Sequence, residues 1–227
     1  MKNINSTVVI FAAHPDDEVL GCGGTIAKLT QQGSKVHVVF LADGESSRSD
    51  IVSIDNLILQ RKKNAIDALR VLGCTSVDFL DFPDNRLDSL DLLDIVKKIE
   101  GFIDAYKPIK VFTHYAHDLN IDHQITHNAV VTACRPQPEY CVKELLFFEV
   151  PSSTEWSLFK TFSPNYFVDI SDTLSLKIDA LNAYKNELQP FPHPRSIKAV
   201  ESLACYRGAS SGCKAAEAFI IGRKIEK

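Results

Sequence analysis

The pattern of apolar and polar positions along the chain predicts strands that alternate with helices. Residues 7–13 (TVVIFAA) form a nearly continuous apolar run rich in β-branched side chains, which is typical of a strand buried on both faces. Comparable runs lie at 35–43, 77–81 and 109–114. The segments between these runs predict helices, with stop signals at Gly33, Gly73 and Pro108, over residues 17–32, 54–72 and 89–106.

This order, βαβαβαβ, favours a parallel sheet with right-handed crossovers and helices on both faces. We therefore expect an α/β fold, a three-layer Rossmann-like sandwich around a mostly parallel central sheet. Past Arg135 the pattern is looser, and it predicts strands at 145–150, 165–170 and 218–224 and helices at 172–188 and after Ser196. The proline-rich segments there are predicted to be loops, so that residues 1–227 form a single domain.

Composition limits the classes of partner. The net charge of -4, without a basic run interleaved with aromatic residues, argues against nucleic acid. No apolar run approaches the about 18 residues that a transmembrane helix needs. The six cysteines form no CxxC pair, so they predict neither a thiolate zinc site nor a disulfide framework, and we expect reduced thiols in the cytoplasm. The sequence is compatible with a homo-oligomer and does not define the oligomeric state.

The densest polar cluster follows the first predicted strand directly, in the segment His14-Pro15-Asp16-Asp17-Glu18. Three carboxylates beside an imidazole repel one another at the end of a buried strand unless a cation neutralises them. A divalent metal would do so. The alternative is that Asp16 or Asp17 only caps the following helix, a position that Asp favours.

A second polar cluster follows the fourth predicted strand and consists of His114, His117, Asp118, Asn120, Asp122, His123 and His127. In a doubly wound sheet the first and fourth strands are neighbours, and their carboxyl ends line the ligand crevice. We therefore expect the two clusters to converge. Histidine and carboxylate donors fit zinc or another divalent transition metal better than calcium. An alternative metal pair is His123 with His127, four residues apart on a predicted helix.

The AHPDDE segment at residues 13–18, together with the Asp122-His123 pair, resembles the LmbE/PIG-L family of metal-dependent N-deacetylases. Further likeness lies in the turn Asp43-Gly44-Glu45, in the helix that contains Arg61 and in the AEAF segment near the end of the chain. The resemblance covers essentially the whole chain.

The resemblance implies that His14, Asp17 and His123 bind the metal, normally Zn²⁺, and that Asp16 is the general base. Because Asp16 and Asp17 are adjacent, one carboxylate can face the metal while the other faces the attacking water. The implied substrate is an N-acetylglucosamine-like sugar or its nucleotide-, lipid- or thiol-linked conjugate. The implied reaction is hydrolysis of the acetamide.

The chain departs from the family pattern at two positions. Many members carry H-x-D-H where this chain has Asn120-Ile121-Asp122-His123. Asn120 cannot act as an acid, but it can donate a hydrogen bond to the oxyanion, and protonation of the amine then passes to His117, His114 or back through Asp16. Asp122 is expected to orient His123 or another imidazole. The second departure is Asn64, where many relatives have an acidic residue.

Three further residues are candidates for contact with substrate. Arg61 could bind a hydroxyl or phosphate group, with a solvated helix residue as the alternative. His193 and Arg195 lie in a proline-rich loop of the kind that often lines binding sites, with ordinary turn residues as the alternative. His37, inside the second predicted strand, is expected to be a packed histidine.

Two other functional classes stay open at this point. One is a Rossmann-type protein that binds a nucleotide or a sugar and has lost catalysis, which the departures at Asn64 and Asn120 favour. The other is a zinc amidase that acts on a non-sugar amide with the same metal site.

Overall fold

The computed structural model describes residues 6–47, 54–138, 140–158 and 160–226. Its strands join in one seven-stranded sheet in the order β3-β2-β1-β4-β5-β7-β6. The strands are β1 (Thr7–Ala12), β2 (Lys35–Ala42), β3 (Ser76–Phe82), β4 (Lys110–His114), β5 (Glu144–Phe148), β6 (Tyr166–Asp169) and β7 (Ala216–Lys224). The pairings along β3-β2-β1-β4-β5 are parallel, and β7 runs antiparallel to both β5 and β6.

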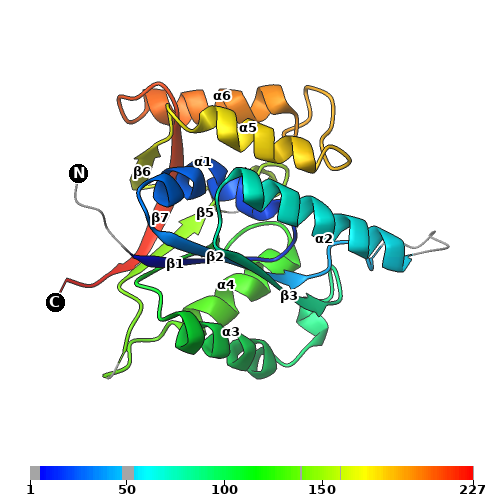
Figure 1. Ribbon diagram of the computed structural model, residues 1–227, viewed down its shortest axis with the longest axis vertical. Coiled ribbons are helices and arrows are strands. Elements are labelled where there is room, and N and C mark those ends of the chain that lie inside the picture. Colours follow the sequence, from blue (N-terminus) through cyan, green and yellow to red (C-terminus); the bar gives the residue numbers. More distant parts are fainter. Residues whose placement is uncertain (1–5, 48–53, 139, 159, 227) are drawn as a thin grey trace.

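Helices cover both faces of the sheet. The helices are α1 (Asp17–Gln31), α2 (Ile54–Val71), α3 (Leu92–Tyr106), α4 (Ile121–Ala133), α5 (Leu174–Ala183) and α6 (Ile197–Ala209), with 3-10 turns η1 (Leu87–Ser89) and η2 (Thr154–Trp156). Figure 1 shows α1, α2, α5 and α6 on one side of the sheet and α3 and α4 on the other. The expected three-layer α/β architecture with a mostly parallel sheet is confirmed.

The apolar run of β1 is buried because the sheet has a core on each face. Val8 and Ile10 belong to the apolar cluster beneath α1, whereas Val9 and Phe11 belong to the cluster above α3 and α4. Alternate side chains of a strand point to opposite faces, so a central strand in a three-layer fold is apolar at every position. This strand ends at Ala12, two residues before His14.

The element boundaries differ from the expected ones mainly near α5. The predicted helix 172–188 is too long, because α5 ends at Ala183. The next residue, Tyr184, is fully buried and donates a hydrogen bond to Glu18. A tertiary contact therefore accompanies this helix end, where the sequence carries no local stop signal.

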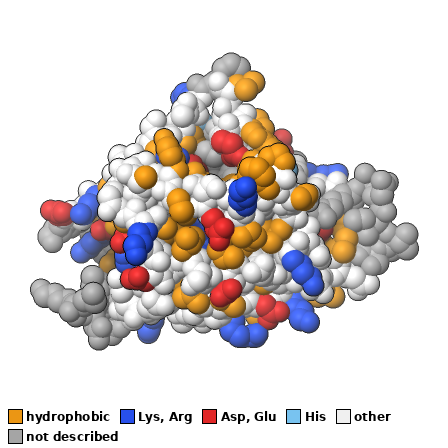
Figure 2. Space-filling model, turned by 90° about the horizontal axis from the view of Figure 1, so that it is seen from above, with side chains coloured by type: hydrophobic (Ala, Val, Ile, Leu, Met, Phe, Trp, Pro, Cys, Tyr) orange, Lys and Arg blue, Asp and Glu red, His pale blue; other side chains and the backbone are white. Residues whose placement is uncertain are grey.

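Two features bear on partners. Among the helices of the described residues, none combines the length and the apolar character needed to cross a bilayer. Figure 2 shows the face over α5 and α6, where basic and acidic side chains are interspersed among apolar and uncharged ones. The described part of that face has no large patch of positive or negative charge.

Candidate active site

The ends of β1 and β4 bring the two polar clusters together. The two strands pair in parallel, with Ile10 opposite Phe112. Directly after β1, the backbone N–H of Ala13 donates a hydrogen bond to Nε2 of His114 over 2.8 Å. The first and fourth strands are thus neighbours, as expected, and both polar clusters lie at the same edge of the sheet.

Three donor side chains meet at this edge. Nδ1 of His14 and Nε2 of His123 each lie 3.3 Å from Oδ2 of Asp17. One donor atom from each of these residues lies within 4.8 Å of the other two, and all three side chains are buried. The three residues that the family resemblance implies as metal ligands are therefore adjacent in space.

The remaining nitrogen of each imidazole faces another carboxylate. Nε2 of His14 lies 3.0 Å from Asp122 and 3.1 Å from Asp84, and Nδ1 of His123 lies 3.1 Å from Asp118. Asp122 is therefore hydrogen-bonded to His14, while Asp118 lies within ion-pair distance of His123. Carboxylates behind a ligating imidazole set its orientation and tautomer.

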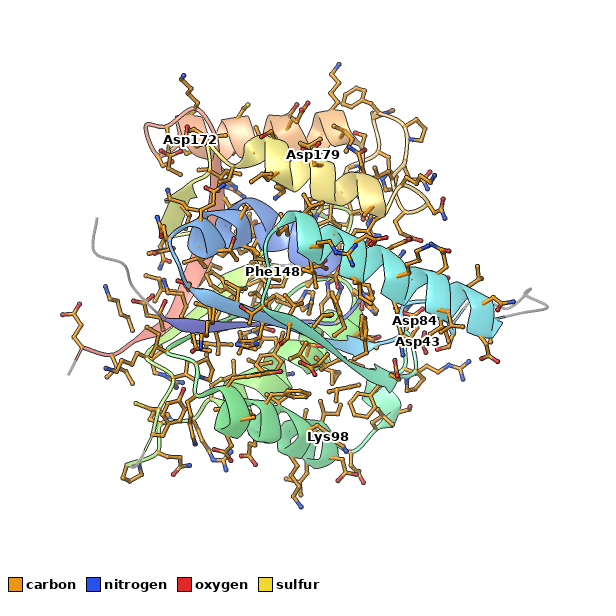
Figure 3. The ribbon with its side chains drawn as sticks, viewed as in Figure 1. Asp43, Asp84, Lys98, Phe148, Asp172 and Asp179 are labelled. Carbon is orange, nitrogen blue, oxygen red and sulfur yellow. The ribbon has the colours of Figure 1, made fainter. Side chains whose placement is uncertain are left out.

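Sequence reasoning assigned no role to Asp84 and none to Asp118. Asp84 follows β3, so the rule that the carboxyl ends of parallel strands meet at one edge could have found it. Figure 3 labels Asp84 beside Asp43, which follows β2, and both lie at this edge beneath α2. Asp118 lay within the second polar cluster, but only the fold shows which imidazole it contacts.

The residues present fit a divalent metal. Four carboxylates, those of Asp17, Asp84, Asp118 and Asp122, are buried around three imidazoles, those of His14, His114 and His123. Oδ1 of Asp17 and both ring nitrogens of His123 are buried and have no hydrogen-bond partner among the described residues. Buried polar atoms without partners and an excess of negative charge are the expected signs of a cation site.

The electrostatics of the cluster depend on the same contacts. Burial alone would lower the pKa of His14, but the surrounding carboxylates raise it well above its usual value. Against the same effect of burial, Asp17 and Asp118 raise the pKa of His123 to about 9. Burial, followed by the charge of His123, holds the pKa of His114 well below its usual value. The pKa of His114 is thus shifted down, whereas the pKa values of His14 and His123 are shifted up.

Asp16 has a different environment from Asp17. Its backbone lies at φ 119, and its side chain makes no capping hydrogen bond to α1, so the interpretation of Asp16 as a simple helix cap is wrong. Oδ2 accepts hydrogen bonds from Arg195 (2.8 Å) and Arg61 (3.3 Å). Oδ1 is buried and has no hydrogen-bond partner among the described residues. Burial raises the pKa of this carboxyl, against the opposing charges of Arg195 and Arg61.

The two arginines hold Asp16 from different elements. Arg61, on α2, is only 5% exposed, so the alternative of a solvated helix residue is wrong. It also forms an ion pair with Glu187. Arg195, in the loop before α6, donates through Nε to Oγ of Ser152 over 2.7 Å. Both guanidinium groups are thereby fixed beside one carboxylate oxygen.

A cavity of about 180 Å³ opens beside these groups. Its lining is almost wholly polar and comes from several segments far apart in the sequence: His14, Asp16, Gly44, Ser47, Arg61, Asp84, Asn85, Asn120, Glu187 and Arg195. A polar pocket that reaches both the metal-donor cluster and Asp16 is suited to a small ligand rich in hydrogen-bonding groups.

Asn120 lines this cavity as the N-cap of α4. Its Oδ1 accepts from the backbone N–H of Asp122 (2.8 Å) and of His123 (3.4 Å), which turns the amide nitrogen outward. Nδ2 donates to Oδ1 of Asn85 over 3.1 Å. The cap therefore fixes an uncharged donor at the place where many relatives have histidine.

The structure places three other candidate histidines outside the cavity lining. His117 is exposed and lies 3.1 Å from Nζ of Lys160. The donor atoms of His14, Asp84 and Asp122 form a second cluster that could hold a metal ion beside that of His14, Asp17 and His123. His127 lies 2.9 Å from the carbonyl oxygen of His114, and it belongs to neither cluster of metal donors among the described residues. His193 accepts from the backbone N–H of Arg195, so its contact is with the loop that positions that arginine.

The fold and site together define an α/β protein with a buried histidine–carboxylate cluster at the carboxyl edge of its sheet, whose donor atoms fit a metal ion. The family model described as "PIG-L: GlcNAc-PI de-N-acetylase" matches residues 9–134, and the chain belongs to this family. It is 30% identical over 190 residues to the uncharacterized deacetylase YaiS of Escherichia coli, covering 81% of this chain and 93% of the relative. It is 27% identical to the diacetylchitobiose deacetylase of Thermococcus kodakarensis, covering 92% and 80%.

The fold itself extends beyond proteins named deacetylases. The structure of 4-carboxy-2-hydroxymuconate hydratase from Pseudomonas putida superposes with a TM-score of 0.81 at 21% identity, covering 98% of both chains. Because one fold hosts different chemistries, the activity has to be argued from the site.

Proposed function

We propose that this protein is a metal-dependent N-deacetylase that hydrolyses the acetamide of an N-acetylglucosamine-like sugar or of its nucleotide-, lipid- or thiol-linked conjugate. The observation that carries the proposal is the pair of adjacent buried carboxylates, Asp16 and Asp17. One faces two imidazoles, and the other faces a polar cavity with one oxygen unpaired among the described residues. The names of the curated relatives support the same bond class.

His14, Asp17 and His123 would hold the metal, and their nitrogen and oxygen donors suit zinc. When bound, zinc would act as a Lewis acid that polarises a carbonyl and lowers the pKa of a water molecule to about 7. Asp122, Asp84 and Asp118 keep the two imidazoles oriented for this role.

Asp16 is the proposed general base. Arg61 and Arg195 hold its Oδ2, so that Oδ1 can accept a proton from the water that attacks the acetyl carbon. As the new C–O bond forms, the Nδ2 amide of Asn120 donates a hydrogen bond to the developing oxyanion. Asp16 then returns the proton to the sugar nitrogen as the C–N bond breaks, releasing the free amine and acetic acid, which ionises to acetate at neutral pH. His117 is exposed, which makes it a weaker candidate for this last step.

The lining of the cavity supports a sugar substrate. Side-chain amides, a hydroxyl and charged groups surround it, and such groups match the many hydroxyls of a hexose. Arg61 and Arg195 are engaged by acidic side chains, and they contribute to substrate binding through the position of Asp16. His193 contributes through the loop that carries Arg195.

Release of acetate tests the proposal. Metal-replete protein is incubated with N-acetylated monosaccharides, disaccharides and conjugates, and acetate is measured, with Asp16→Asn as the matched inactive control. Turnover of sugars but not of simple acetamides supports the sugar deacetylase, whereas preference for non-sugar amides supports a zinc amidase. Sugar binding without acetate release, unchanged in Asp16→Asn, would instead support the binding protein that has lost catalysis.

We also propose that residues 1–227 act as one domain, because all described strands belong to a single sheet. The cytoplasm stays the predicted location.

A further inference from the structure

Glu18 is a buried carboxyl that the proposed mechanism does not use. It lies in the first turn of α1 with no exposed surface, outside both clusters of metal donors and outside the cavity lining. Its two oxygens have separate partners: Oε2 accepts from the backbone N–H of Asp16 over 2.9 Å, and Oε1 accepts from the hydroxyl of Tyr184 over 2.7 Å. Tyr184, directly after α5, is also fully buried.

The N–H that Glu18 accepts belongs to a residue in a disfavoured conformation. Asp16 has φ 119 and ψ -27, and a residue with a Cβ atom rarely adopts positive φ. Such a conformation persists only where the surroundings over-determine it. It is also the conformation that directs the Asp16 carboxylate to Arg61 and Arg195, away from the capping position on α1.

We propose that Glu18, braced by Tyr184, is a positioning residue that holds the backbone of Asp16 in this conformation and so aims its carboxylate into the cavity. Figure 1 shows α5 lying along α1, which is the arrangement that brings Tyr184 to Glu18. The kinetic part of this inference rests on the proposed function, whereas the structural part does not.

The same two helices offer a matched control. Thr173, the N-cap of α5, is also buried, and its hydroxyl donates to the carbonyl of Gly24 over 2.8 Å. This contact joins α5 to α1 beyond the interruption at Cys22, on the side away from Asp16. Tyr184→Phe and Thr173→Val thus each remove one buried hydroxyl between α5 and α1, and only the first bears on Asp16.

The kinetic experiment compares Glu18→Leu, Glu18→Gln, Tyr184→Phe and Thr173→Val for kcat, KM, bound metal and Tm. Glu18→Leu is expected to lower kcat about a hundredfold with KM and metal content retained, because a misaimed catalytic group costs about that factor. Glu18→Gln, whose amide oxygen still accepts from the Asp16 N–H, should restore most of the activity. Tyr184→Phe should lower kcat, whereas Thr173→Val should lower only Tm.

A crystal structure of Tyr184→Phe and, if it folds, of Glu18→Leu decides the structural part whatever the activity. The expected result is that Asp16 leaves positive φ and loses its contact with Arg195. If Asp16 keeps the wild-type conformation, or if Glu18→Gln is as inactive as Glu18→Leu, Glu18 does not position the base. Loss of kcat in proportion to Tm in all four variants, Thr173→Val included, would equally overturn the inference. An inactive wild-type protein would refute the proposed function. The crystal structures would still show whether Glu18 holds the backbone of Asp16.

Discussion

Asp16 and Asp17 are neighbours in the chain, yet their carboxylates lie in different surroundings. Asp17 follows the helical path of α1 and meets His14 and His123, whereas the positive φ of Asp16 turns its side chain toward the two arginines. One backbone reversal thus separates the proposed metal ligand from the proposed general base. This separation makes the two roles testable by single substitutions.

His14→Ala and Asp17→Ala are expected to abolish tight zinc binding, because each removes one of three protein donors. Asp16→Ala should retain the metal and lose turnover, since it removes only the proton acceptor. Metal analysis of the dialysed proteins by mass spectrometry checks the first result and acetate release checks the second. Equal metal content in all three variants would contradict the ligand assignment.

Asp122→Asn and Asp118→Asn are each expected to weaken zinc affinity about 10- to 100-fold, because each removes the carboxylate that orients one ligating imidazole. Asp179→Asn, an exposed site on α5 that Figure 3 labels far from this edge, is the control and should leave affinity unchanged. Competition with a chromophoric chelator measures the affinities. Wild-type affinity in both site variants would show that the carboxylates do not orient the ligands.

At the scale of elements, α1 is interrupted at Cys22, where the backbone leaves helical geometry. The buried pair Lys177–Glu217 satisfies the groups that this break exposes: Lys177 donates to the carbonyl of Leu20, and Glu217 accepts from the N–H groups of Gly24 and Thr25. The interruption lets the first turn of α1, which carries Asp17 and Glu18, pack separately from the rest of the helix. The glycines beside Cys22 permit this close packing.

Gly21→Ala is expected to destabilise the protein by about 1–3 kcal/mol, because overpacking a filled core forces side chains out of place. A Cβ atom at Gly21 would lie 2.4 Å from the ring of Phe148, whose side chain is fully buried. Gly101→Ala on α3 is the matched control: nothing lies within 4 Å of its added Cβ, and replacing a helical glycine stabilises by about 0.5–1 kcal/mol. Urea unfolding of both variants measures the difference, and equal shifts would contradict the packing argument.

At the scale of the whole molecule, the buried carboxylates of the proposed metal site are expected to link folding to metal binding. Removing zinc with a chelator should lower Tm, because a bound ligand stabilises the native state by about 2.7 kcal/mol at a hundred times its Kd. Tm should recover when zinc is restored. Differential scanning fluorimetry measures both, and Asp17→Ala, which lacks a ligand, should show no response. A chelator effect of the same size in Asp17→Ala would place the stabilising metal elsewhere.

His37 gives the fold a pH dependence away from the site. It lies 2.7 Å from the hydroxyl of Ser76 and stacks on Tyr106, as expected for a packed histidine, and burial lowers its pKa below the usual 6.5. The unfolded chain therefore binds the proton more tightly, so the stability from neutral His37 is present above about pH 6.5 and is lost as pH falls toward its folded pKa.

His37→Gln keeps a hydrogen-bonding side chain and removes this titration. As the pH is lowered from about 7.5 to about 5.5, the unfolding free energy of the wild type should decrease relative to that of this variant. Urea unfolding at both pH values measures it. A difference that does not change with pH would show that His37 titrates alike in the folded and unfolded states.

The sequence by itself determined the layered fold and the edge at which the site lies. Continuous apolar runs such as residues 7–13 and the alternation of strand and helix depend on local periodicity, which is readable without coordinates. The order of the first four strands then places their carboxyl ends side by side, so the convergence of His14, Asp17 and His123 followed from topology. The AHPDDE segment supplied the family.

Only the tertiary structure decided which partner each of these groups has. Asp122 contacts His14, Arg61 is buried against Asp16, and Tyr184 reaches Glu18, 166 positions away in the chain. Hydrogen bonds over such separations depend on how helices and loops pack on the sheet, which no local pattern records. The proposed division of roles between Asp16 and Asp17 therefore rests on packing. Asp16 contacts Arg195 in the loop before α6, and Glu18, which accepts from the N–H of Asp16, contacts Tyr184 directly after α5.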